Sequence, residues 1–312
     1  MLHHRHFVGR STLRVLFLAS AIGVATGGVA LAVRAEPAGV EQAAPYRNDR
    51  LSVEVIGSGP DVILIPGLGS SREVWRPVAT RLAATHRVHL VQLAGFAGEP
   101  WTHGDGPFLQ PAIDALAAYI RDAKLDRPAV IGHSMGGLSG LMLAQQHPDL
   151  VGRLMSVDSL PFFSAMFGPQ VTVEAARPFA AQAAAGVLSA DDATFGAQQS
   201  QGAVGFTRSQ AVRSAIVEWS LASDRHAFAS ALSDVMTTDV RPQLAGMATP
   251  VWAIYASDAD GGAPAALADA LWAREYATLP GVTLIRVDGA RHFIMADQPR
   301  TLNEIVDRFL AD

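Results

Sequence analysis

The sequence predicts an α/β fold, in which helices cover both faces of a mostly parallel β-sheet. Segments of strand and helix composition alternate over residues 49–160 and again over residues 249–312. The stretch Asp61–Ile65 is apolar after its first residue and ends at Pro66-Gly67, which is typical of a strand buried on both faces. Residues 161–248 contain no convincing strand and have the composition of three or four helices. We therefore expect one α/β core with a helical cap inserted at 161–248.

Each element follows from a local pattern. Leu51–Ile56 alternates apolar and polar residues, as a half-exposed strand does. Gln110–Ala123 carries apolar residues at helical spacing, and the helix Gly136–His147 stops before Pro148. Further strands are expected at 61–65, 87–93, 129–132, 151–157, 250–255 and 282–287. Further helices are expected at 72–84, 264–276 and 299–310 in the core, and at 171–185, 208–223 and 225–238 in the insertion.

Composition excludes several classes of function. The chain has 312 residues, 49% of them hydrophobic and 17% charged, which is enough for a sizeable core. It has no cysteine, so a disulfide framework and a thiolate metal site are both excluded. The formal net charge is −5, and no basic run occurs beyond the N-terminus, so we expect no nucleic-acid partner.

The N-terminus has the pattern of an export signal. Residues 1–14 carry three arginines and no acid, and Val15–Val33 is uncharged and mostly apolar. Val33 and Ala35 supply small residues before a cleavage point, so we expect a signal peptide at 1–35, a flexible lead-in at 36–48, and a periplasmic or secreted protein. The alternative is an uncleaved membrane anchor at 15–33. Cleavage would leave an acidic chain with no electrostatic attraction to an anionic membrane.

Ser134 is the candidate nucleophile. It lies in Gly132-His133-Ser134-Met135-Gly136, between a predicted strand and a predicted helix. A tight turn there exposes the serine and requires very small residues two positions before and after it, where Gly132 and Gly136 stand. The following helix offers free N–H groups and a positive dipole end to developing negative charge. The alternative is a structural serine in a turn.

A serine hydroxyl needs a base, and His292 is the candidate. It lies in the loop after the last predicted strand, at the same sheet edge as Ser134. The alternative is a loop histidine that hydrogen-bonds the backbone. His133 adjoins the serine, and we expect strand geometry to point it the other way.

The carboxylate that orients the base stays open. Asp258 and Asp260 follow the strand at 250–255, and Asp158 follows the strand at 151–157. We prefer Asp258, with Asp260 and then Asp158 as alternatives. The N–H groups of Met135 and Leu68 are the candidate oxyanion donors, and the alternative for the Leu68 loop is a plain glycine turn.

Together these motifs resemble the α/β-hydrolase superfamily. The resemblance rests on Pro66-Gly67-Leu68-Gly69, the pentad around Ser134 with Gly137, an aspartate after the next-to-last strand, and His292-Phe293 in that chain order. It implies Ser134 as nucleophile and His292 as base, and a helical cap at 161–248. The serine at 134 disfavours the branches with an aspartate nucleophile, the dehalogenases and epoxide hydrolases. The usual Gly-x-x-Asp acid motif is replaced by Ala-Ser-Asp-Ala-Asp.

We therefore expect a serine hydrolase that cleaves an ester or related acyl bond of a small molecule, with no cofactor and no metal. An acyltransferase or perhydrolase would use the same residues, and a non-catalytic binding protein on this fold is the third hypothesis. Phe162, Phe163 and Trp219 are expected to form an apolar pocket wall, unless they pack the cap onto the sheet. The oligomeric state stays open.

Overall fold

The computed structural model describes residues 46–311. The signal peptide predicted at 1–35 lies outside these residues, so export stays a prediction. Tyr46 and Arg47, which the sequence placed in the flexible lead-in, instead form the short strand β1 because they pair with β2. The remainder of the lead-in before residue 46 also lies outside the described part of the chain. Within residues 46–311, no helix combines the length and apolar character needed to span a membrane.

One eight-stranded sheet forms the centre, in the order β1-β2-β4-β3-β5-β6-β7-β8. The first two pairings, β1 with β2 and β2 with β4, are antiparallel, and every other pairing is parallel. This confirms the predicted mostly parallel sheet. The strands are β1 (Tyr46–Arg47), β2 (Leu51–Gly57), β3 (Asp61–Ile65), β4 (Arg87–Leu93), β5 (Ala129–His133), β6 (Arg153–Val157), β7 (Val251–Ser257) and β8 (Thr283–Asp288).

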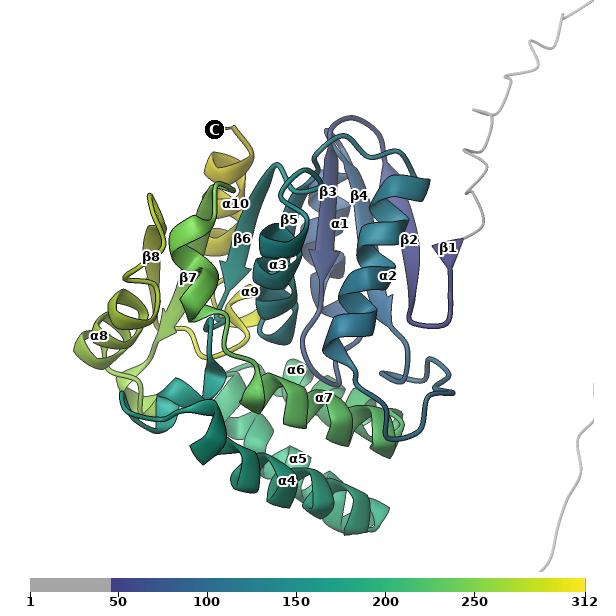
Figure 1. Cartoon of the computed structure of the whole chain (residues 1–312), viewed down its shortest axis with the longest axis vertical. Helices are drawn as coiled ribbons and strands as arrows, with labels where there is room; N and C mark the ends of the chain where they lie inside the picture. The colour runs from purple at the N-terminus through teal and green to yellow at the C-terminus, as the bar shows by residue number, and fades with distance from the viewer. Residues whose placement is uncertain (1–45, 312) are drawn as a thin grey trace, which may run out of the picture. The chain divides into compact units, whose positions relative to one another are not determined.

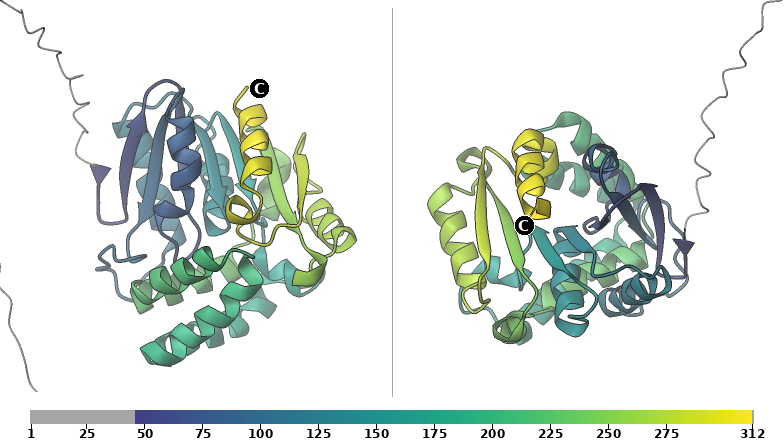
Figure 2. Two further views of the ribbon diagram at one scale, coloured as in Figure 1. Left: turned by 180° about the vertical axis from the view of Figure 1, so that it is seen from behind. Right: turned by 90° about the horizontal axis from the view of Figure 1, so that it is seen from above.

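Helices cover both faces of this sheet. Figure 1 shows α2, α3 and α8 on one face, and the view from behind in Figure 2 shows α1 (blue) and α10 (yellow) on the other. The core helices are η1 (Arg72–Trp75), α1 (Arg76–Leu82), α2 (Leu109–Asp122), α3 (Met135–Gln146), η4 (Ala259–Gly261), α8 (Ala265–Glu275), α9 (Ile294–Asp297) and α10 (Pro299–Ala311).

The apolar strand β3 supplies both layers of the core. Ile63 and Ile65 belong to the cluster beneath α2 and α3, whereas Val62 and Leu64 belong to the cluster beneath α1 and α10. Successive side chains of a strand point to opposite faces, so a strand covered on both sides is apolar throughout. This is the physical basis of the continuous apolar run in the sequence.

The chain between β6 and β7 is helical. It contains η2 (Phe163–Phe167), α4 (Val173–Ser189), α5 (Asp192–Phe206), α6 (Gln210–Leu221), α7 (Arg225–Thr237) and η3 (Arg241–Gly246). Helix α4 packs against α7, and α5 packs against α6. Figure 1 shows these four helices across the end of the sheet at which β5 stops. They form the helical cap, and they cover the end of the sheet at which Ser134 follows β5.

Candidate functional site

Ser134 lies on a strained turn between β5 and α3. Its backbone angles are φ 54° and ψ −122°, which a non-glycine residue rarely adopts. A Cβ on Gly132 would lie 2.2 Å from the carbonyl oxygen of Gly136, and one on Gly136 would lie 2.5 Å from that of Ile65. The turn therefore requires glycine at both positions, as the pentad indicates. The strain at Ser134 holds its side chain clear of the strand.

Two backbone segments that could bind an oxyanion lie beside this serine. Met135 opens α3, where the first N–H groups of a helix have no partner inside the helix. The loop after β3 also approaches closely, because a Cβ on Gly67 would lie 3.2 Å from Cβ of Ser134. Leu68 follows in that loop and lines the same cavity as Ser134.

His292 lies in the loop after β8, and the structure places Asp158 behind it. The Nδ1 atom of His292 is 2.7 Å from Oδ2 of Asp158. A carboxylate accepts hydrogen bonds, so Nδ1 carries the proton and Nε2 is left free to accept one. The other oxygen of Asp158 accepts the N–H of Ala256 at 2.9 Å. Both carboxylate oxygens are therefore held, and the imidazole is fixed in one tautomer.

The structure corrects the preference for Asp258 as this carboxylate. Asp258 is 5% exposed and pairs with two arginines. Its carboxylate accepts a hydrogen bond from Nε–H of Arg291 at 2.7 Å and another from Arg208. The bond from Arg291, aided by Arg208, lowers the pKa of the Asp258 carboxyl despite its burial. Asp260, the second choice, has an exposed side chain whose carboxylate meets Arg208 at 3.3 Å. Both aspartates thus serve ion pairs near the cap.

His133 is a site residue that sequence reasoning missed. Its Nε2–H donates to the carbonyl oxygen of His292 at 2.9 Å, and the two ring centroids are 4.6 Å apart. The ring is 1% exposed, and Nδ1 has no hydrogen-bond partner among residues 46–311. Burial, with a further electrostatic contribution from the neighbouring His292 ring, holds the pKa of His133 well below its ordinary value. The ring is therefore neutral at neutral pH.

Ser134 and His292 line one small cavity, which we call the serine cavity. Its volume is about 100 Å³, and its walls come from the Gly67–Ser70 loop, the histidine loop and the cap. No hydrogen bond joins the Ser134 hydroxyl to the His292 ring within the described residues, although both face this space. Catalytic hydrogen bonds are often long in the absence of substrate and tighten when it binds. The cap residues of the wall are Gln199, Phe206, Ile216, Ser220 and Phe228.

A second cavity, which we call the outer cavity, borders the same histidine. It measures about 410 Å³ and lies between η2, α8 and the histidine loop. Phe163 lines it, as expected for a pocket wall. Phe162 and Trp219 line neither of these two cavities, so the structure does not place them at the wall predicted for them. Phe162 is fully buried with Ala165 and Ala176 inside the cap, whereas Trp219 packs against the core cluster beneath α1 and α10.

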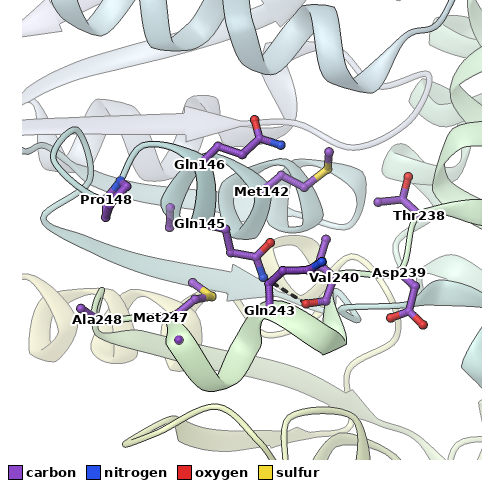
Figure 3. A pocket seen from close by; sticks show the side chains of 12 residues that line it. Met142, Gln145, Gln146, Pro148, Thr238, Asp239, Val240, Gln243, Met247 and Ala248 are labelled. Carbon is purple, nitrogen blue, oxygen red and sulfur yellow. Dashed lines mark hydrogen bonds between the residues drawn. The ribbon is translucent and has the colours of Figure 1, made fainter.

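The larger space near α3 is a different feature. It measures about 550 Å³ and is formed by the end of α3 and the chain around η3 (Figure 3). There Nε2 of Gln145 donates to the carbonyl oxygen of Val240 at 3.1 Å. Neither Ser134 nor His292 lines it, so the size of a cavity does not identify the candidate functional site.

Residues 46–311 contain no group of three or more His, Asp or Glu side chains arranged to hold a metal ion.

A family model described as the alpha/beta hydrolase family matches residues 62–305. A pimeloyl-[acyl-carrier protein] methyl ester esterase from Edwardsiella ictaluri is 31% identical over 216 residues, which cover 68% of this chain and 80% of that protein. The one from Aeromonas salmonicida is 36% identical over 115 residues, 37% of this chain. The chain spans only 44% of the length of that relative.

Solved structures share the architecture. A hydrolase from Pseudomonas aeruginosa has a TM-score of 0.71 at 22% identity, covering 84% of this chain and 94% of that one. An esterase from Thermogutta terrifontis has a TM-score of 0.71 at 19% identity, covering 86% of this chain and 98% of that one. At these identities the likeness concerns the fold.

Proposed function

The chain belongs to the alpha/beta hydrolase family, and from that premise we propose that it hydrolyses a carboxylic ester through an acyl-enzyme on Ser134. One observation carries the proposal. Ser134 on its strained turn and the His292–Asp158 pair face the serine cavity and its border, beneath the cap. The relatives named as methyl ester esterases support an ester as the substrate.

The proposed reaction starts with attack by the Ser134 oxygen on the ester carbonyl carbon. Nε2 of His292 takes the serine proton as the new C–O bond forms, because Nδ1 already carries a proton shared with Asp158. Asp158 then stabilises the imidazolium. The carbonyl oxygen becomes negatively charged, and the N–H groups of Leu68 and Met135 stabilise that charge.

Collapse of this intermediate breaks the ester C–O bond. The proton on Nε2 of His292 passes to the leaving oxygen, which departs as an alcohol and leaves the acyl group on Ser134. A water molecule then attacks the acyl carbon while His292 takes one of its protons. Breakage of the acyl–Ser134 bond releases a carboxylic acid, and the proton on His292 returns to the serine oxygen.

The test compares Ser134→Ala with Ser200→Ala, which removes an exposed α5 hydroxyl that donates to the Gly196 carbonyl oxygen. With p-nitrophenyl acetate, Ser134→Ala is expected to lose turnover by on the order of 10³-fold or more. Ser200→Ala should retain it, and circular dichroism checks that both variants fold. Unchanged turnover in Ser134→Ala would exclude the mechanism.

A fluorophosphonate probe gives an independent readout. It should label the wild-type chain at Ser134, because it captures an activated serine, and should not label Ser134→Ala. Absence of labelling on folded wild-type protein would favour a non-catalytic binding role. Product analysis with added methanol separates hydrolysis from acyl transfer, since transfer yields a methyl ester.

A further inference from the structure

The serine cavity and the outer cavity meet at two side chains. Phe206 and His292 line both of them. Ser134 lines the serine cavity but not the outer one, and Asp158 lines the outer cavity but not the serine one. The His292 ring therefore stands between the candidate nucleophile and the outer cavity.

The walls of the outer cavity favour an uncharged, apolar occupant. They consist mostly of apolar side chains: Leu160, Phe163, Met166, Leu267, Leu271 and Trp272. The charged members are already engaged. Asp258 and Arg291 bind each other at 2.7 Å, and Asp158 binds His292 and the N–H of Ala256. An ionic ligand would have to displace these pairs, whereas an apolar group buries surface without breaking them.

The proposed chemistry assigns a direction to the substrate. His292 must hand its proton to the leaving oxygen, so that oxygen and the group it carries lie against the His292 ring. The acyl carbon is bound to Ser134, with its oxygen toward Leu68 and Met135. The acyl group therefore belongs to the serine cavity, and the alcohol group extends past His292 and Phe206.

From this arrangement we propose that the outer cavity binds the alcohol part of the ester, and that this part is an apolar cycloalkyl or aryl group larger than the acyl part. The proposal rests on the function proposed above. The volumes agree with it, since the outer cavity offers about 410 Å³ and the serine cavity about 100 Å³. A small acyl group such as acetyl suits the latter.

Phe206 borders both spaces. Its carbonyl oxygen accepts the N–H of Phe293 at 2.9 Å, which fixes its backbone against the histidine loop. Phe206 is 42% exposed, and the centroid of its ring lies 5.4 Å from that of the His292 ring. The Phe206 ring is therefore a side chain that an alcohol group extending past His292 would contact.

Two isomeric esters test the proposal directly. Cyclohexyl acetate carries its ring on the alcohol side, and methyl cyclohexanecarboxylate carries the same ring on the acyl side. The wild-type chain is expected to hydrolyse cyclohexyl acetate with a kcat/KM at least about tenfold higher. Equal values, or a preference for methyl cyclohexanecarboxylate, would overturn the assignment of the outer cavity.

A wall variant provides the second measurement. Leu271→Trp fills part of the outer cavity and should reduce the ratio of the two kcat/KM values by about tenfold. Leu188→Trp is the matched control, because Leu188 is a half-exposed leucine of α4 that lines neither cavity, and it should leave the ratio unchanged. An unchanged ratio in folded Leu271→Trp would contradict the proposal.

Failure of this proposal and failure of the proposed function give different results. If p-nitrophenyl acetate turnover requires Ser134 but the isomer ratio is near one, the assignment of the outer cavity is wrong and the hydrolase function stands. If p-nitrophenyl acetate turnover persists in Ser134→Ala, the serine mechanism itself is wrong, and the direction assigned to the substrate falls with it.

Discussion

The Nε2–H of His133 donates to the carbonyl oxygen of His292 across 2.9 Å, so the residue before the proposed nucleophile holds the backbone of the proposed base. His133 ends β5 and His292 follows β8. These two strands are separated in the sheet by β6 and β7. This bond therefore sets the spacing between two separate strand ends. We infer that His133 is a positioning residue for His292.

Removing this donor should lower activity more than stability. His133→Phe keeps a ring but loses the N–H, and kcat for p-nitrophenyl acetate should fall by about ten- to a hundredfold because His292 is no longer held in place. His133→Gln retains an N–H near the same position and should recover most of that loss. Equal kcat values for the two variants would show that the hydrogen bond does not position His292.

Acid should destabilise the wild-type chain through His133. An unfolded histidine binds a proton near pH 6.5, but the buried His133 has a much lower pKa, so unfolding takes up a proton below that pH. The stabilising contribution is complete above about pH 6.5 and is lost as the pH falls below it. In urea unfolding, the free energy of unfolding of the wild-type chain should fall by about 2 kcal/mol more than that of His133→Gln between pH 6.5 and pH 5. Parallel losses would place the acid sensitivity at other groups.

Substitution of Asp158 should lower activity, whereas substitution of Asp258 should lower stability. Asp158→Asn should reduce kcat on the order of 10³–10⁴-fold with little change in melting temperature, because an amide cannot stabilise the imidazolium or fix the tautomer. Asp258→Asn should retain far more turnover but melt several degrees lower, because Arg208 and Arg291 lose an ionised partner. Measurements of kcat and of thermal unfolding for both variants show which aspartate supports His292. A greater loss of kcat in Asp258→Asn would restore the assignment that sequence favoured.

Glycine at 132 should be indispensable, whereas glycine at 186 should not. Ala at 132 would place Cβ 2.2 Å from a backbone oxygen, so we expect a destabilisation of about 2–4 kcal/mol and loss of p-nitrophenyl acetate turnover. Gly186 lies inside α4, and a Cβ there meets nothing within 4 Å. Gly186→Ala should retain turnover and gain up to about 1 kcal/mol from helix propensity. A stable, active Gly132→Ala would show that the turn around Ser134 is looser than its contacts indicate.

The sequence predicts the fold well because buried strands and helices have recognisable local patterns of apolar residues. The run at 61–65 fills two core layers at once, and glycine, proline and helical spacing mark most element ends. The choice between Asp158 and Asp258 has no such signal, since they follow β6 and β7, which are neighbouring parallel strands. It depends on Arg208, a cap residue 50 positions away in the sequence, which pairs with Asp258.

His133 escaped sequence reasoning for a different reason. Strand alternation predicts that neighbouring side chains point to opposite faces, and we expected His133 to face away from the site. Ser134 has left the strand at φ 54°, so alternation no longer relates the two side chains. Departure from regular geometry at the proposed nucleophile itself is what makes the orientation of its neighbour hard to predict.

The hydrogen bonds at the junction of α5 and α6 tie the cap to the histidine loop. Besides the bond between Phe206 and Phe293, Thr207 Oγ1 and the N–H of Arg208 both donate to the Asp297 carboxylate, at 2.6 and 2.9 Å. Asp297 also accepts the N–H of Arg291, the residue before His292. Displacement of the cap at this corner would therefore also displace His292, the proposed general base. The position of the cap over Ser134 and the position of the proposed base are thus coupled in this chain.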